Sequence, residues 1–227
     1  MNGFLLIGIV FAVIGMIVQG TLKSKFEKYS KMSLRNGLSG KEIAEKMLHD
    51  HGIMDVKVIS VQGHLTDHYN PANKTVNLSH QVYHGRSAAA AAVAAHECGH
   101  AVQHAQAYAM LKFRSAIVPM VNIASSVMPW LLMASVFLLS KVPGLLLLAI
   151  IAQAAITLFT LITLPVEFDA SKRALVWVKE KNVVTTEEYS GAKDALTWAG
   201  MTYLVSALAA VTQLMYLIMR YSGSRRD

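Results

Sequence analysis

Long apolar blocks without a charged residue dominate the pattern of this sequence. Three of them, residues 3–22, 116–140 and 142–166, contain no Asp, Glu, Lys or Arg. Each is long enough to cross the hydrocarbon core of a bilayer as a helix, which takes about 20 residues. We therefore predict a transmembrane helix over residues 1–22 and a transmembrane helical hairpin over residues 115–166.

The first block could instead be a secretory signal peptide, but its flanks argue against that reading. No basic residue precedes the block, and no small-x-small cleavage site follows it. Lysines come directly after it, which is typical of the cytoplasmic end of a retained span, at Lys23, Lys25 and Lys28.

A tight turn is expected between the second and third blocks. Lys141 is the only charged residue there, and Pro143-Gly144 is a turn signal. The ammonium group of Lys141 would reach the membrane interface while its stem stays in the apolar layer. Pro119 and Pro129 are expected to kink the second helix, which membrane helices tolerate when neighbours satisfy the freed carbonyls.

A fourth block, residues 198–219, is less apolar than the others. Hydroxyl and amide side chains dilute it, at Thr202, Ser206, Thr212 and Gln213. Its length favours a fourth transmembrane helix, and a buried amphipathic helix is the alternative. A basic tail follows over residues 220–227.

The one substantial polar region spans residues 23–114, and three helical segments are expected in it. Residues 23–35 should extend the first helix into solvent. Ser39 and Glu42 have the spacing of a capping box, so a second helix should begin there and end near Gly52. Ser87 is placed to cap a long alanine-rich helix, because alanine has the highest helix propensity.

Two short strands are expected between these helices. Residues 55–61 alternate apolar and polar side chains, and residues 75–79 form a second such run. Gly63 and the pair Asn70-Pro71 are typical of turns. The polar region therefore combines helices with a small sheet.

Composition agrees with a membrane protein, since apolar residues make up 54% of the chain and charged residues 15%. The net charge of +7 arises from basic residues that flank the apolar blocks and form no clustered stripe with aromatic residues. We therefore expect no nucleic-acid partner. Cys98 is the only cysteine, which excludes an intramolecular disulfide.

The distribution of Lys and Arg also predicts an orientation. Basic residues concentrate in the connections 23–114 and 167–197, and cytoplasmic loops are where such residues accumulate. Both connections should therefore face the cytoplasm, with both termini outside. Arg220, Arg225 and Arg226 argue against an outside C-terminus, unless the fourth block does not cross.

The segment His96-Glu97-Cys98-Gly99-His100 fits the His-Glu-x-x-His pattern. With about 100° between successive helical residues, the two histidines share one face, about 6 Å apart along the axis. Two imidazoles so placed can bind one zinc ion, and Glu97 can reach a water on that zinc as its general base. The alternative is a helix with two surface histidines and a solvated glutamate. The position within a strong helix that follows the strands argues against it.

A catalytic zinc usually has three protein ligands and one water. His104 lies one turn further along the same face, but three ligands on successive turns span about 12 Å, too far for bonds of about 2 Å. Glu167 is the better candidate, because a carboxylate directly after an apolar block is costly without a partner. Its alternative role is a charge at the N-terminus of the following helix, which the helix dipole favours.

Several separated segments together resemble a known family. They are the zinc motif, Leu65-Thr66-Asp67-His68-Tyr69-Asn70-Pro71, the Ser-Ala-rich helix, and Glu167-Phe168-Asp169-Ala170-Ser171. They are similar to segments of the membrane-bound neutral zinc metallopeptidases of the YugP type, found in bacteria. The resemblance runs from the first apolar block through Ala174. It implies a Zn²⁺ cofactor held by His96, His100 and Glu167, as in the similarly arranged HtpX and CAAX-prenyl membrane peptidases.

The chain departs from the HtpX pattern at Ser171, where those peptidases have an aspartate that steadies a zinc-bound histidine. Asp169 or another group would then supply this support, or the support is lost.

We therefore predict a mainly α-helical membrane protein with about four transmembrane helices. A small α+β zincin-like catalytic region, residues 23–114, would be inserted between the first and second spans. Residues 167–197 would form a helix that carries the third zinc ligand.

The predicted activity is that of a membrane-embedded zinc endopeptidase that hydrolyses peptide bonds of membrane or membrane-proximal proteins. Candidates for oxyanion or substrate contacts, taken from the matching motifs, are His68, Tyr69 and Arg173. We expect residues 75–79 to be an edge strand that can pair with an extended peptide. The partners would be the bilayer and a protein or peptide substrate, at the cell membrane with the catalytic region on the cytoplasmic side.

Two functions of other classes compete with this prediction. A non-proteolytic zinc-binding membrane scaffold would need no base beside its ligands, so the presence of Glu97 argues against it. A small transporter should carry ionisable residues inside its spans, and Lys141 is the only charge between residues 116 and 166. The remaining histidines are expected to be exposed or packed polar residues: His49, His51, His64, His80 and His84.

Overall fold

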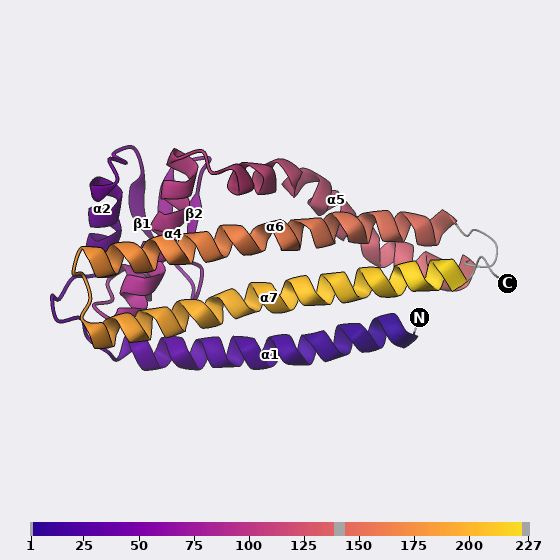
Figure 1. The fold of residues 1–227 in the computed structure, drawn as a ribbon, viewed down its shortest axis with the longest axis horizontal. Coiled ribbons are helices and arrows are strands. Elements are labelled where there is room, and N and C mark those ends of the chain that lie inside the picture. The colour runs from indigo at the N-terminus through magenta and orange to yellow at the C-terminus, as the bar shows by residue number, and fades with distance from the viewer. Residues whose placement is uncertain (1, 139–143, 224–227) are drawn as a thin grey trace. The chain divides into compact units, whose positions relative to one another are not determined.

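A computed structural model of the chain describes residues 2–138 and 144–223 (Figure 1). The expected turn at Lys141 and Pro143 lies outside the described residues. The chain divides into two compact units. We call residues 1–18, 112–165 and 202–227 the apolar unit, and residues 19–111 and 166–201 the polar unit.

Four long helices within the described residues are apolar enough to cross a membrane. They are α1 (Asn2–Ser30), α5 (Ala109–Leu138), α6 (Gly144–Glu180) and α7 (Thr186–Gly223). Only 17% of the apolar window of α7 is buried, so α7 does not have the character of a buried amphipathic helix. The prediction of four candidate spans is therefore confirmed by length and composition.

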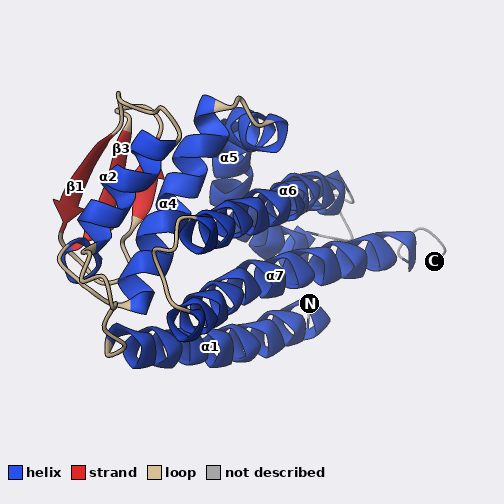
Figure 2. Ribbon diagram, turned by 60° about the vertical axis from the view of Figure 1, so that its left-hand side comes forward, coloured by secondary structure: helices blue, strands red, loops and turns tan. Residues whose placement is uncertain are grey.

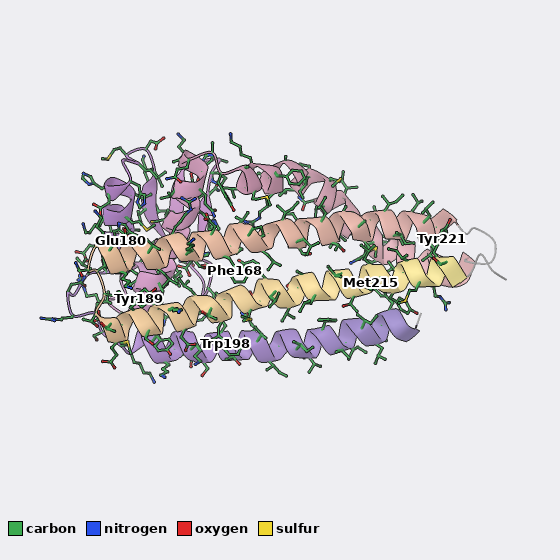
Figure 3. The ribbon with its side chains drawn as sticks, viewed as in Figure 1. Phe168, Glu180, Tyr189, Trp198, Met215 and Tyr221 are labelled. Atoms are coloured by element: carbon green, nitrogen blue, oxygen red, sulfur yellow. The ribbon has the colours of Figure 1, made fainter. Side chains whose placement is uncertain are left out.

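Apolar side chains lie on the outside of the apolar unit. Leu5 of α1, Trp130 of α5 and Met215 of α7 are 63%, 66% and 57% exposed, and Figure 3 labels Met215. Such an arrangement would be unfavourable in water but suits hydrocarbon, because lipid tails are as apolar as these side chains. Inside the unit, small residues such as Ala149 let the helices pack closely.

The polar unit contains a small sheet with helices packed against it (Figure 2). The elements that lie wholly within it are α2 (Gly40–Asp50), β1 (Lys57–Val61), β2 (His68–Asn70), β3 (Thr75–Ser79), α3 (His80–Tyr83) and α4 (Ala88–Ala105). The strand order is β1-β3-β2, with β1 parallel and β2 antiparallel to β3. Helix α2 contacts β1 and β3, whereas α4 contacts β2 and β3.

The expected helix starts in the polar unit are confirmed. Ser39 and Glu42 form both halves of a capping box at the start of α2. The side chain of Ser87 accepts a hydrogen bond from the backbone N–H of Ala90 at the start of α4. Each cap satisfies amide donors that the first turn of a helix leaves without a partner.

The prediction that residues 75–79 form an edge strand is wrong. β3 is the central strand, and all five of its residues are buried. The third strand, β2, ends at Asn70, where the sequence indicated only a turn. Three residues are too few for an apolar-polar alternation to be recognised, which is why the sequence did not indicate β2.

The first helix also ends earlier than expected. α1 stops at Ser30, and its last turns bury Phe26 and Tyr29 in the core of the polar unit instead of extending into solvent. The core is otherwise built around α4, whose residues from Ala88 to Ala92 are at most 2% exposed. Because alanine side chains are small, neighbouring elements can approach this helix closely.

Helix α6 continues without a break from the third apolar block through Glu167 to Glu180. Glu167 therefore lies far from any helix N-terminus, so its alternative role as an N-terminal helix charge is excluded. The predicted segment 167–197 comprises the end of α6, a turn and the start of α7. Phe168 and Trp198, labelled in Figure 3, belong to these two helices of the polar unit.

Candidate metal centre

His96 and His100 lie one turn apart on α4, as the motif predicts. Their rings are edge to face with centroids 4.8 Å apart, and each side chain is 12% exposed. Most residues in the neighbouring turns of α4 are buried alanines, so the helix that carries the two imidazoles is rigidly packed. The helix therefore holds two nitrogen donors side by side in a largely dry environment.

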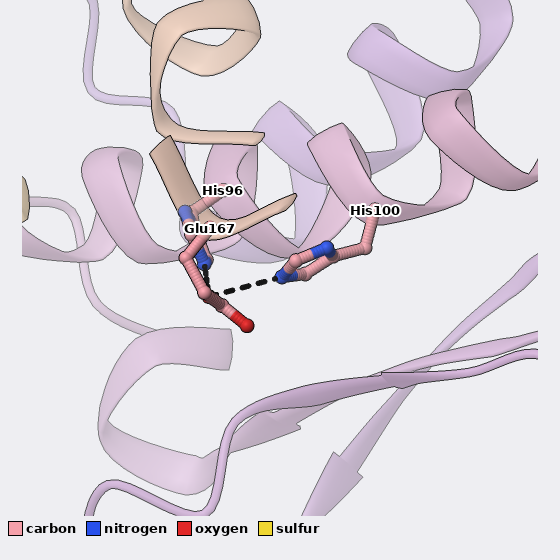
Figure 4. Close-up of side chains that lie close together, drawn as sticks. All are labelled: His96, His100 and Glu167. Carbon is pink, nitrogen blue, oxygen red and sulfur yellow. Dashed lines mark ion pairs between the residues drawn. The ribbon is translucent and has the colours of Figure 1, made fainter. Parts of the chain in front are cut away.

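Glu167 of α6 completes a group of three potential ligands (Figure 4). Its Oε2 lies 3.4 Å from Nε2 of His96 and 3.5 Å from Nε2 of His100. The ligand atoms of the three residues all lie within 4.8 Å of one another, and Glu167 is 3% exposed. Among the described residues, this is the one such group of three or more His, Cys, Asp or Glu side chains.

Zinc fits this set of donors. Two imidazole nitrogens and one carboxylate oxygen form a ligand set of known catalytic zinc sites. Two ligands about 2 Å from one tetrahedral ion lie roughly 3.3 Å apart, close to the distances between Glu167 and the two imidazoles. Three protein ligands would leave the fourth position of a tetrahedral zinc ion for water.

Gly99 allows α6 to approach the motif. A Cβ atom built on Gly99 would lie 2.6 Å from the backbone oxygen of Ala170, closer than real Cβ contacts occur. Gly99 stands between the two histidines, and Ala170 is one turn after Glu167. The absence of a side chain at Gly99 thus lets the backbone that carries Glu167 come within reach of both imidazoles.

Glu97 is buried, with 7% of its surface exposed. Its Oε2 accepts a hydrogen bond of 2.9 Å from the backbone N–H of Tyr69 in β2. The edge strand therefore fixes one carboxylate oxygen of Glu97. The other oxygen is not needed for this contact.

Asp67 fixes the segment just before β2 to the end of β3. Its carboxylate accepts hydrogen bonds from the backbone N–H and the hydroxyl of Ser79, at 2.7 and 3.2 Å. Burial raises the pKa of Asp67, the amide of Ser79 lowers it, and the nearby charge of Glu97 raises it further, so the net shift is upward.

The charges of Glu97 and Glu167 change the pKa of two residues of the motif. Burial lowers the pKa of His100, but contacts with Glu167 and the charge of Glu97 outweigh this effect, so its pKa is raised. Burial, with a further contribution from Glu97, raises the pKa of the Cys98 thiol well above its usual value. The site therefore favours positive charge, while Cys98 stays a neutral packing residue.

The side chains of the other predicted site residues contact groups outside the three potential ligands. Nδ1 of His68 lies 2.8 Å from the carbonyl oxygen of Thr66, in an exposed position. The hydroxyl of Tyr69 lies 2.8 Å from Nδ1 of His104, which is outside the ligand group. A role of His68 or Tyr69 in substrate contacts stays a prediction.

Arg173 has protein partners of its own. Its Nε donates to Oδ2 of Asp169 at 2.5 Å and its Nη1 donates to Oε1 of Gln106 at 2.6 Å. Arg173 thus connects α6 to the end of α4 and is held by protein partners on both sides. A direct role of Arg173 in oxyanion stabilisation also stays a prediction.

The hydroxyl of Ser171 lies 3.0 Å from Nδ1 of His96, at the position where the HtpX pattern has an aspartate. The support of His96 is therefore present in a neutral form. Asp169 instead contacts Gln103, whose side chain lies 3.0 Å from Nδ1 of His100. The sequence reasoning missed Gln103, and its signal was a glutamine one turn after the second histidine of the motif.

The five remaining histidines were expected to be exposed or packed, and all are exposed. None of them belongs to the ligand group: His49, His51, His64, His80 and His84.

Comparisons with known proteins agree with this chemistry. The sequence profile of a family described as "Putative neutral zinc metallopeptidase" matches residues 4–222. A protein of Bacillus subtilis (strain 168), "Putative membrane protease YugP", is 41% identical over 225 residues, which cover 98% of this chain and 99% of that protein. No solved structure matches the chain.

The family match extends over nearly the whole chain, implies Zn²⁺ as the cofactor, and accompanies four helices fit to cross a membrane. The chain therefore belongs to the family of neutral zinc metallopeptidases and is a multi-pass membrane protein.

Proposed function

We propose that this chain is a membrane-embedded zinc endopeptidase that hydrolyses peptide bonds of membrane or membrane-proximal proteins. The observation that carries the proposal is the convergence of His96, His100 and Glu167, with ligand atoms within 4.8 Å of one another. These three side chains would hold the ion. When bound, zinc lowers the pKa of a water towards 7 and polarises the scissile carbonyl.

Glu97 is the proposed general base. It takes a proton from the attacking water and delivers it to the leaving amine. The bond from the Tyr69 amide to Oε2 of Glu97 supports this role, because it orients the carboxylate without using its second oxygen.

The arrangement in the membrane belongs to the same proposal. Residues 23–114 form the main part of the catalytic region between the first and second spans, and α6 supplies the third ligand, Glu167, directly after its apolar segment. The concentration of Lys and Arg in residues 23–114 and 167–197 supports a cytoplasmic location for this region. A site beside the bilayer surface would act on proteins at or in the membrane.

The test is the Glu97→Gln variant of the full-length protein in detergent micelles. Glutamine keeps an acceptor for the Tyr69 amide but cannot take a proton. We therefore expect unchanged zinc content and a loss of about 10²- to 10⁴-fold in hydrolysis. Zinc is measured by mass spectrometry, and hydrolysis by degradation of an unfolded membrane protein.

Glu45→Gln is the matched control, because Glu45 is an exposed glutamate of α2 whose ion pair with Lys41 lies at the surface. It should hydrolyse at the wild-type rate. Undiminished hydrolysis by Glu97→Gln would overturn the role of Glu97. Zinc binding by the wild type without any hydrolysis would favour the non-proteolytic scaffold instead.

A further inference from the structure

Gln103 is a buried polar residue that the catalytic proposal does not use. It lies on α4, one turn after His100, and none of its surface is exposed. A buried amide is costly unless its donors and acceptor are hydrogen-bonded. The hydrogen-bond partners of Gln103 therefore determine how its amide is oriented.

Those partners fix the orientation of the amide. Nε2 of Gln103 donates to the carbonyl oxygen of Val166 at 2.8 Å and to Oδ2 of Asp169 at 2.7 Å. Both of these groups are pure acceptors, so both hydrogens of the amide nitrogen are used. The reverse orientation would set the amide oxygen against a carbonyl and a carboxylate, which repel it.

The remaining atom of the amide, Oε1, faces His100. It lies 3.0 Å from Nδ1 of this histidine and can only accept a hydrogen bond. Nδ1 of His100 must therefore carry a proton and donate it. In the neutral imidazole, which is the form that binds a metal, the lone pair is then on Nε2, the atom that lies 3.5 Å from Oε2 of Glu167.

Asp169 is itself fixed by a cation. Nε of Arg173 donates to the same oxygen, Oδ2, that accepts from Gln103. Arg173 in turn donates to Gln106 and lies over the ring of Tyr108, with 5.8 Å between its guanidinium carbon and the ring centroid. The result is a continuous series of contacts from Arg173 through Asp169 and Gln103 to His100.

Among the described residues, no group that can only accept a hydrogen bond is recorded at Nδ1 of His96. Its Nδ1 lies 3.0 Å from the hydroxyl of Ser171, which can either donate or accept. Ser171 therefore orients the ring without deciding which nitrogen is protonated. The two imidazoles of the site differ in how firmly the protein sets their proton positions.

We propose that Gln103 and Asp169 are positioning residues that hold the proton of His100 on Nδ1 and keep Nε2 available to the metal. This proposal rests on the proposed role of His100 as a ligand. Outer partners of this kind raise the basicity of a ligating histidine and fix its orientation, and their loss typically weakens metal binding about 10- to 100-fold.

The test compares the zinc-loaded full-length wild type with Gln103→Leu, by nuclear magnetic resonance of nitrogen-15-labelled histidine. In the wild type, His100 should have its ring proton on Nδ1, exchanging slowly with water because it is hydrogen-bonded. In Gln103→Leu this resonance should shift and exchange rapidly. Zinc affinity, measured by competition with a chelator, should fall by about 10- to 100-fold.

Two control variants separate this role from general packing. Gln106→Ala removes the other glutamine contact of the series and leaves His100 untouched, so the His100 resonance should persist. Ser171→Ala should alter the His96 resonance and leave that of His100 unchanged. Asp169→Asn should shift the His100 resonance in the same direction as Gln103→Leu, by a smaller amount.

A wild-type His100 with its proton on Nε2 would overturn the proposal, and this result needs no variant to fold. Unchanged His100 exchange and unchanged zinc affinity in Gln103→Leu would also overturn it. Failure of the proposed metal site, on which this inference rests, looks different. In that case the wild type would bind no zinc, or His100→Ala would bind it with wild-type affinity.

Discussion

Polar side chains are buried in both units, but their partners differ. In the apolar unit, Gln153 and Thr157 of α6 both donate to the carbonyl oxygen of Ala210 in α7. In the polar unit, His96, His100 and Glu167 face one another instead of a backbone. A polar group bonded to a carbonyl ties two helices together, whereas three potential metal ligands that converge on one point can hold an ion.

One helical glycine from each unit also differs in its surroundings. In α1 of the apolar unit, Gly15 has no atom within 4 Å of the position where a Cβ would stand. In α4 of the polar unit, Gly99 has a backbone oxygen at 2.6 Å from that position. Gly99 thus permits a close approach of two helix backbones at the metal site, which bringing Glu167 to the histidines requires.

The largest expected effect on zinc binding comes from removing Glu167, the proposed ligand that joins the two histidines. Glu167→Ala leaves two neutral imidazoles without the carboxylate, so we expect zinc affinity to fall by more than about 100-fold, beyond the loss typical of outer partners. Hydrolysis should be lost with the zinc. Zinc per chain after purification in detergent, together with chelator competition, measures the effect.

Treatment of the wild type with a strong chelator should abolish hydrolysis in the same way, and added zinc should restore it. Glu167→Ala should not recover on addition of stoichiometric zinc. If Glu167→Ala keeps one tightly bound zinc per chain, the contrast between the two units fails, since the carboxylate would then not serve the metal.

A smaller effect is expected from adding one methyl group at the close approach. Gly99→Ala forces α4 and α6 apart, and such overpacking typically costs about 1–3 kcal/mol of the free energy of unfolding. Zinc affinity should fall as well, because Glu167 moves away from the imidazoles. Denaturant unfolding in micelles and chelator competition measure the two effects.

Gly15→Ala is the matched control in the apolar unit. It should be neutral or stabilise by up to about 1 kcal/mol, because alanine is the better helix former and the space is open. Equal stability and equal zinc affinity of Gly99→Ala and the wild type would show that the approach at Gly99 does not position Glu167.

The smallest effect is expected from a buried polar group of the apolar unit. Gln153→Leu removes one donor from the carbonyl of Ala210, which still accepts from Thr157. Hydrogen bonds between membrane helices contribute about 0.6 kcal/mol on average, so the free energy of unfolding should change by about that amount. Zinc content and hydrolysis should stay at wild-type values.

Thermal unfolding in micelles and zinc analysis of Gln153→Leu test this expectation. Loss of zinc from this variant would break the comparison, since a polar group of the apolar unit would then serve the metal site. A much larger loss of stability would mean that Gln153 is more than one of several links between α6 and α7.

Local features of the sequence predicted much of the fold. The lengths of the apolar blocks predicted the four candidate spans, and the spacing of Ser39 and Glu42 predicted the start of α2. Alanine content and the spacing of His96 and His100 predicted one helical face with two imidazoles. These inferences succeeded because helix propensity, capping and span length depend on residues that are close together in the sequence.

The errors came from features that depend on distant segments. Residues 75–79 have the pattern of a strand, but only pairing with both β1 and β2 makes β3 central. The end of α1 has the polarity of a solvent-exposed helix, yet Phe26 and Tyr29 find partners in the core. Nothing within a few residues of these positions encodes such contacts.

The sequence by itself therefore determined the helices, their apolar lengths and the two imidazoles on one helical face. Tertiary structure alone brought Glu167 within 3.5 Å of those imidazoles and set Gln103 between Asp169 and His100. The physical reason is that helix formation is a local equilibrium, whereas the distance between α4 and α6 is set by packing, above all at Gly99 and Ala170.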